Sequence, residues 1–229
     1  MKALVLAGGL GTRLRPRFGD LPKPLAPIGG QPFLTRQLEW LRDRGIRRSV
    51  VLAGYGAEQM IETVGDGSSL GVTVDWSVES EPLGTGGALR LAAPHVDGSV
   101  IVANGDTLGD ADPWTLERDR WEHAMIGAVA LYRVEDARSR GRVEVDGSGR
   151  ISAFVEKDER HEGVAWVNGG LYAFSPQLWK ELPDGASSLE RDTLPRLAAE
   201  GRLLGVPCDG RFWDIGTPEE HARAEEDLT

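Results

Sequence analysis

The first half of the chain alternates between short apolar runs and amphipathic stretches. In PFLTRQLEWLRDRG, residues 32–45, apolar side chains recur every three or four positions, which places them on one face of a helix. Similar stretches predict further helices at 57–64 and 85–96, and short apolar or alternating runs predict strands at 2–7, 47–54, 71–79 and 99–106. An alternation of strands and helices along the chain is typical of a parallel sheet with helices on both faces.

The second half is less regular. It predicts strands at 124–134 and 164–175, a hairpin over 141–157 with DGSG as its turn, and a terminal helix over 217–228. No linker or repeat interrupts the chain. We therefore predict one α/β domain over 1–229, in which the second half adds mixed strands to a mostly parallel central sheet.

The amino-acid composition limits the partners and the cellular compartment that the protein can have. The net charge is -10 and the isoelectric point is about 5.0, which argues against nucleic acid as a partner. The only cysteine, Cys208, excludes an internal disulfide and favours a reducing compartment. The apolar run at the start is too short for a signal peptide, and none approaches the roughly 20 residues of a membrane span. We expect a cytoplasmic protein with no membrane contact. The sequence does not determine the oligomeric state, and a homo-oligomer is one of the alternatives.

Chemistry concentrates in the loop after the first strand, GGLGTRLRP at 8–16. Glycines without Cβ atoms let backbone amides approach an oxyanion, and Arg13 can place two N–H groups on phosphate oxygens. The glycines alone also fit a plain tight turn, and they match neither common nucleotide-binding glycine motif. Further on, Lys23 stands between two prolines that restrict its backbone.

GGLGTRLRP followed by LPKPLAPIGGQPFL resembles the signature of the sugar-1-phosphate nucleotidyltransferases. The resemblance continues through ESEPLGTGGAL (79–89), NGDT (104–107), FVEK (154–157), VNGG (167–170) and RFWDIGT (211–217). It implies a Rossmann-like nucleotidyltransferase fold, with about 1–110 binding the nucleotide and about 111–229 binding the sugar. The implied reaction joins an NTP and a sugar 1-phosphate into an NDP-sugar and pyrophosphate, by Mg²⁺-dependent in-line attack. Many members append a β-helix domain, and we expect none here.

The resemblance also implies roles for individual residues. The nucleotide would be bound by Leu6, Ala7, Gly8, Gly9, Gly11, Thr12, Arg13, Glu79, Pro82, Leu83, Gly84 and Thr85. The sugar would be bound by Asn104, Gly141, Glu156, Lys157, Asn168 and Gly169. The catalytic residues would be Arg13, Lys23, Asp106, Lys157 and Asp214, with Asp106 and Asp214 as Mg²⁺ ligands. One departure is Asp158, which stands where the family often has proline.

Glu79 bears on the choice of nucleotide. Family members that use UTP or TTP often carry glutamine at this place, whereas a carboxylate has only acceptors. Guanine offers two neighbouring donors, N1–H and N2–H, which one carboxylate can accept together, whereas O4 of uracil would face it without a donor. We therefore favour GTP, with Glu81 as an alternative reader.

Within the family, the motifs resemble most those of members that use D-glycero-α-D-manno-heptose 1-phosphate. Mannose 1-phosphate is the nearest alternative, and a uridylyl- or thymidylyltransferase for another hexose 1-phosphate follows. Outside this activity, the chain could be a regulatory sensor of nucleotide sugars. It could also be a glycosyltransferase that binds a metal through DAD at 110–112. The four histidines and Cys208 match no ligand spacing, so we interpret them as structural or surface residues.

Overall fold

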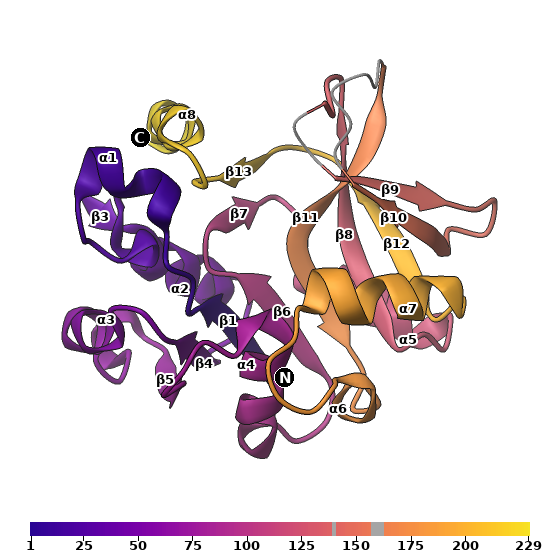
Figure 1. The fold of residues 1–229 in the computed structure, drawn as a ribbon, viewed down its shortest axis with the longest axis horizontal. Helices are drawn as coiled ribbons and strands as arrows, with labels where there is room; N and C mark the ends of the chain where they lie inside the picture. Colours follow the sequence, from indigo (N-terminus) through magenta and orange to yellow (C-terminus); the bar gives the residue numbers. More distant parts are fainter. Residues whose placement is uncertain (139–140, 157–162) are drawn as a thin grey trace.

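The structure is a computed structural model that describes residues 1–138, 141–156 and 163–229. Its centre is a nine-stranded sheet (Figure 1). Four parallel neighbours in the order β6-β1-β4-β5 form the first half: β1 (Lys2–Ala7), β4 (Arg48–Ala53), β5 (Thr73–Val78) and β6 (Val100–Asn104). These are the four predicted strands, so the parallel part of the fold is confirmed.

The second half continues the same sheet through one long strand, β11 (Ala165–Phe174). One part of β11 pairs antiparallel with β6, and the other part pairs with the hairpin strand β9 (Arg142–Val145). The remaining strands are β8 (Gly127–Val134), β10 (Ile151–Val155) and β12 (Leu203–Cys208). The predicted mixed extension of the sheet is confirmed.

Helices cover both faces because successive side chains of each strand point to opposite sides. On one face, Val5 of β1 belongs to the core that includes Leu38 and Met60, from α2 (Phe33–Asp43) and α3 (Ala57–Val64). On the other face, Leu4 belongs to the core that includes Leu89 of α4 (Gly84–Ala92). This second face is also covered by α6 (Leu178–Glu181) and α7 (Leu194–Ala199).

The sequence pattern did not predict α6, α7 or the short strand β13 (Phe212–Asp214), and it also missed two larger elements of the second half. One is α5 (Pro113–Glu122), which packs on the α2 face through Leu116. Its N-cap is Asp112, whose side chain accepts from the amides of Trp114 and Thr115 at 3.3 and 3.1 Å. The other is β12, which pairs with β8.

The C-terminal helix α8 (Pro218–Leu228) lies beside α1 (Arg15–Phe18), which follows the glycine loop after β1 (Figure 1). Leu14, Phe33 and Ala224 belong to a third, smaller core between them. A carbonyl only accepts, so His221 Nε2 carries the hydrogen in its 2.9 Å contact with the Pro27 oxygen. Helix α8 thereby holds the segment that precedes it against the loop that follows β1.

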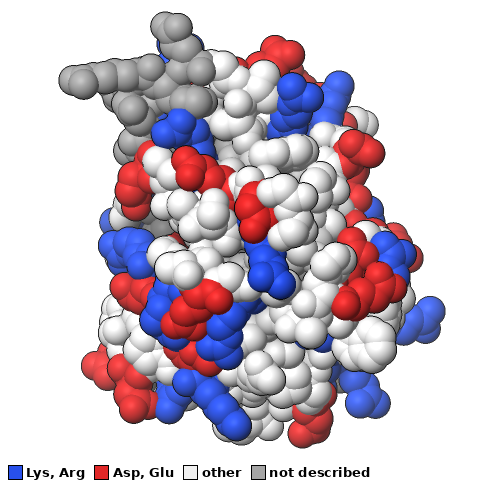
Figure 2. Space-filling model, turned by 90° about the vertical axis from the view of Figure 1, so that its right-hand side faces the viewer, with Lys and Arg blue, Asp and Glu red and all other residues white. Residues whose placement is uncertain are grey.

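The remaining elements are short. They are β2 (Pro27–Ile28), β3 (Gln31–Pro32), β7 (Thr107–Gly109), β13 (Phe212–Asp214), the 3-10 turns Thr12–Leu14, Lys23–Leu25, Ser68–Leu70 and Ala93–His95, and a π-helical turn at Leu189–Thr193. On the face drawn in Figure 2, basic and acidic side chains of the described residues are interspersed. Among those residues we find no helix with the length and apolar character needed to cross a bilayer.

Candidate active site

Four parallel strands end at one edge of the sheet, and candidate residues directly follow three of them. Gly8 and Gly9 follow β1, Glu79 follows β5, and residues 104–107 close β6. They border a cavity of about 350 Å³, which we call the β1 cavity. It is lined by Leu6, Gly8, Gly9, Leu10, Glu79, Pro82, Gly84, Thr85, Ala88, Asn104, Asp106 and Glu190. Ligands of open α/β sheets bind at this edge, so the predicted nucleotide residues lie where a ligand is expected.

The loop glycines differ in what they contact. A Cβ on Gly8 would stand 2.9 Å from Oε1 of Glu79, and one on Gly11, which has a φ of +58°, would stand 2.8 Å from Cβ of Lys23. At Gly9 a Cβ would meet no atom within 4 Å. Gly11 is therefore required by its backbone conformation and by Lys23, and a side chain at Gly8 would displace the Glu79 carboxylate. The backbone at Gly9, in contrast, borders open space that an anion can enter.

Lys23 and the two predicted metal-binding aspartates come together at one point. The Lys23 ammonium is buried and donates to Oδ2 of Asp106 at 2.6 Å, and it lies 3.9 Å from Oδ1 of Asp214. The two aspartates are neighbours because β13 pairs antiparallel with β7, which sets Asp214 opposite Thr107. Two carboxylates thus converge on a single cation.

This arrangement fits Mg²⁺. Asp106 and Asp214 carry the hard oxygen atoms that Mg²⁺ prefers as ligands, and substrate phosphates would supply others. Each carboxylate is also oriented by the protein, because Thr107 donates to Oδ1 of Asp106 at 3.1 Å and the Gly216 amide donates to Oδ1 of Asp214 at 2.6 Å. In the part of the chain that the structure describes, no group of three or more acidic, histidine or cysteine side chains could hold a metal without a substrate.

Gln37 supports this centre and was missed by the sequence interpretation. Its side chain is 1% exposed, and its Nε2 donates to the backbone oxygens of Asn104 and Thr107, both at 2.8 Å. The turn that carries Asp106 is therefore held from α2. Gln37 lies among apolar helix positions, where a buried amide is the one signal that could have indicated this role.

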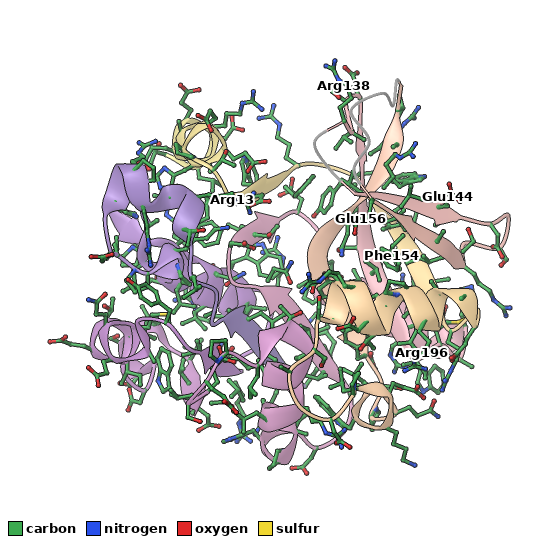
Figure 3. The ribbon with its side chains drawn as sticks, in the orientation of Figure 1. Arg13, Arg138, Glu144, Phe154, Glu156 and Arg196 are labelled. Atoms are coloured by element: carbon green, nitrogen blue, oxygen red, sulfur yellow. The ribbon has the colours of Figure 1, made fainter. Side chains whose placement is uncertain are left out.

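Arg13 stands in the 3-10 turn Thr12–Leu14 and is exposed. A Cβ built on Gly216 would lie 3.3 Å from Nη2 of Arg13, so the guanidinium lies beside the Asp214 turn. In Figure 3, Arg13 lies near β7 and β13, and Glu156 lies toward the mixed half of the sheet. A phosphate between the glycine loop and Asp214 would be within reach of Arg13.

A second cavity of about 530 Å³ opens on the mixed half of the sheet, and we call it the β11 cavity. It is lined by Gly141, Arg142, Val143, Phe154, Val155, Glu156, Val167, Asn168, Glu190, Arg191, Pro195 and Asp214. The pairing of β11 with β8 shifts register between Asn168 and Tyr172, which is where β11 meets this cavity. Apolar walls with a few acids and amides can hold a sugar ring and its hydroxyls.

Some of the predicted sugar residues lie elsewhere. Asn104 lines the β1 cavity. Gly169 lies outside the lining of the β11 cavity, because its Cα faces Tyr132, and a Cβ there would stand 2.4 Å from that ring. Lys157 and Asp158 lie outside the described residues.

The predicted nucleotide-binding residues differ in whether they line the β1 cavity. Glu79 lines the β1 cavity and accepts from the Leu83 amide at 3.0 Å, whereas Glu81 is exposed and lies outside the lining. Gly84 has a φ of +69°, and a Cβ there would stand 2.5 Å from the Ser187 oxygen. The lining of the β1 cavity does not include the remaining predicted nucleotide residues, which are Ala7, Gly11, Thr12, Arg13 and Leu83.

The DAD segment binds the protein's own backbone. Asp110 Oδ2 accepts from the Arg211 amide at 2.9 Å, and Asp112 caps α5. The feature that favoured a glycosyltransferase thus has a structural use.

Cys208 is partly buried, and burial raises the pKa of its thiol to about 11, which fits the structural role expected of it.

Comparison with known proteins shows to which protein family the chain belongs. The model of the nucleotidyl transferase family matches residues 2–229, and the chain belongs to this family. The predicted family resemblance is confirmed.

Individual relatives narrow the comparison. The mannose-1-phosphate guanylyltransferase of Mycobacterium tuberculosis (strain ATCC 25618 / H37Rv) is 37% identical over 232 residues, which cover 99% of this chain and 64% of that protein. The D-glycero-alpha-D-manno-heptose 1-phosphate guanylyltransferase of Aneurinibacillus thermoaerophilus is 35% identical over 233 residues, which cover 100% of this chain and 98% of that protein. The crystal structure of HddC from Yersinia pseudotuberculosis complexed with GMP-PN superposes with a TM-score of 0.88 at 33% identity, covering 100% of this chain and 99% of that one. The chain spans about three fifths of the length of several curated mannose-1-phosphate guanylyltransferases that it matches.

Proposed function

We propose that the protein is a sugar-1-phosphate guanylyltransferase, which joins GTP and a sugar 1-phosphate into a GDP-sugar and releases pyrophosphate. The observation that carries the proposal is the position of Lys23 between Asp106 and Asp214. Asp106 lines the β1 cavity and Asp214 lines the β11 cavity, so Lys23 and the Mg²⁺ that these carboxylates would hold stand where two anionic substrates would meet.

The chemistry needs charge neutralisation and alignment more than proton transfer. A sugar phosphate is already an anion, so no protein base is required to create the nucleophile. Mg²⁺, held by Asp106 and Asp214, would neutralise charge on the triphosphate. Arg13 would bind the phosphates that leave, Lys23 would bridge the reacting phosphates, and Lys157 would hold the phosphate of the sugar.

Guanine is the favoured base. Glu79 lines the β1 cavity, and the Leu83 amide fixes its carboxylate at 3.0 Å. A carboxylate held in this way can accept N1–H and N2–H of guanine together. The names of the relatives agree with this choice, because two are guanylyltransferases and the HddC structure contains GMP-PN.

The favoured sugar is D-glycero-α-D-manno-heptose 1-phosphate, with mannose 1-phosphate as the alternative. The support is the relative with this specificity whose length the chain matches almost completely. Glu156 and Asn168 offer the β11 cavity an acceptor and an amide for sugar hydroxyls. A cytoplasmic location, where GTP and Mg²⁺ are supplied, completes the proposal.

A pyrophosphate-release screen of four NTPs against a panel of sugar 1-phosphates tests the proposal. The panel contains the heptose, mannose, glucose and N-acetylglucosamine 1-phosphates. We expect turnover with GTP and a manno-configured sugar phosphate, and no release when either substrate is omitted. A clear preference for UTP would overturn the guanine assignment, and no release with any pair would overturn the proposed activity.

A further inference from the structure

Glu190 is the one residue in the described ranges that lines both the β1 cavity and the β11 cavity. It lies in the π-helical turn Leu189–Thr193, which precedes α7. The sequence motifs did not include it. Its position at the junction of two substrate cavities calls for a role in binding.

The carboxylate of Glu190 is oriented by two hydroxyl groups. Its Oε2 accepts from Oγ1 of Thr85 at 2.6 Å and from Oγ of Ser188 at 3.1 Å. Thr85 Oγ1 in turn accepts from the Leu189 amide at 2.8 Å, which fixes the direction of its own hydrogen. Among the described residues no hydrogen bond reaches Oε1, so this oxygen can accept from a ligand.

The β11 cavity, which Glu190 lines, has the composition of a sugar site. Val143, Phe154 and Pro195 give it apolar walls, which suit the carbon faces of a ring. On the polar side, Asn168 Nδ2 donates to the Tyr172 hydroxyl at 2.8 Å. Burial and then the charge of Glu190 raise the pKa of Tyr172, so the phenol stays protonated beside the carboxylate.

We propose that Glu190 determines sugar specificity by accepting, through Oε1, a hydrogen bond from one hydroxyl of the sugar 1-phosphate. Thr85, at the start of α4, ties this carboxylate to the wall of the nucleotide cavity. The inference rests on the proposed function. It assigns a second acidic residue, besides Glu156, to the sugar side.

The test compares Glu190→Gln with the wild-type protein on mannose 1-phosphate and its 2-, 3-, 4- and 6-deoxy analogues. A hydrogen bond to a charged acceptor contributes about 1.5–3 kcal/mol, so we expect kcat/KM for mannose 1-phosphate to fall about 10- to 100-fold. KM for GTP should change less than about twofold. With one deoxy analogue the two proteins should react equally well, because the hydroxyl that Glu190 binds is then missing.

Two controls separate binding from structure. Asp192 lies in the same turn, is exposed and lines neither cavity. Asp192→Asn removes its charge but keeps an oxygen that can accept from the Ser188 amide, as Oδ2 does at 2.6 Å, so we expect kcat/KM within about twofold of wild type. Glu190→Asp keeps the charge and withdraws it by one methylene, and we expect the same loss of discrimination as in E190Q. Either substitution at Glu190 can serve if the other fails to fold.

The inference is overturned if E190Q and E190D lose activity equally on mannose 1-phosphate and every deoxy analogue, which would indicate a structural role. A rise in KM for GTP instead would place Glu190 on the nucleotide side and also overturn it. Wild-type turnover is measured first, and its absence with every sugar phosphate would refute the proposed function itself.

Discussion

Replacing Lys23 with methionine should change how the protein binds a divalent cation before any nucleotide is present. The Lys23 ammonium lies 2.6 Å from Asp106 and 3.9 Å from Asp214, the two proposed metal ligands. A divalent cation that arrives alone must compete with this ammonium. With nucleotide bound, the phosphates would provide Lys23 with another partner.

The size of the effect follows from burial. The Lys23 side chain is 10% exposed, whereas those of Asp106 and Asp214 are 35% and 30% exposed. A charge-assisted hydrogen bond contributes about 1.5–3 kcal/mol, and the exposure of the carboxylates reduces this to about 1–2 kcal/mol. Removing the competing ammonium should therefore tighten cation binding about 5- to 30-fold.

Calorimetric titration with Mn²⁺ in the absence of nucleotide measures this affinity for wild type, Lys23→Met and the control Lys180→Met. Lys180 is an exposed lysine of α6, so K180M should bind Mn²⁺ as wild type does. Without metal, K23M should unfold about 2–8 °C below wild type, because two carboxylates lose their shared cation. Equal or weaker Mn²⁺ binding by K23M would refute the reasoning.

Four further predictions concern single side chains. Asp106→Asn should lower kcat for pyrophosphate release by about 10²-fold or more, and near-normal turnover would contradict its role. Glu79→Gln should reduce the preference for GTP over UTP about tenfold or more, measured as the ratio of kcat/KM values. Gln37→Leu should lower kcat about tenfold, with a smaller effect on KM, because the turn that carries Asp106 loses the two hydrogen bonds that Gln37 donates to its backbone. Burial lowers the pKa of His221 from its ordinary 6.5, so the unfolded chain takes up the proton first as the pH falls. Stability should therefore fall as pH drops from about 6.5 through the lower folded pKa, and denaturant titrations should show a flatter profile for His221→Gln.

The local pattern of hydrophobic residues was sufficient to predict the parallel half of the fold. The helix predicted at 57–64 coincides with α3 (Ala57–Val64), and the strand predicted at 2–7 coincides with β1 (Lys2–Ala7). Each of these elements buries one face or both, so its side-chain period follows its secondary structure. Their order along the chain then predicts the parallel sheet.

The second half was harder because long-range pairing decides it. Pro207 argues against a central strand, but β12 is an edge strand bonded to β8, where proline is tolerated. Helix α5 exposes two of its large apolar residues, Trp114 and Trp121, so its periodicity is weak. Its N-cap, Asp112, was considered instead as part of a metal motif.

The distinction between local pattern and long-range contacts also applies to the candidate active site. Family motifs predicted Lys23, Asp106 and Asp214, which the structure brings together through the pairing of β7 with β13. Glu190 had no motif, and its partner Thr85 lies 105 positions away in the chain. No local pattern predicts such a contact, since it exists only once α4 and the turn before α7 have packed together.

The position of an isotopic label tests the central claim most directly. We would incubate the protein with Mg²⁺, a manno-configured sugar 1-phosphate and GTP labelled with ³²P at either the α- or the γ-phosphate. The account predicts that the α-label appears in a GDP-sugar and the γ-label in pyrophosphate, with both products dependent on the sugar phosphate. Release of the γ-label as inorganic phosphate, or no transfer of the α-label to the sugar, would contradict it.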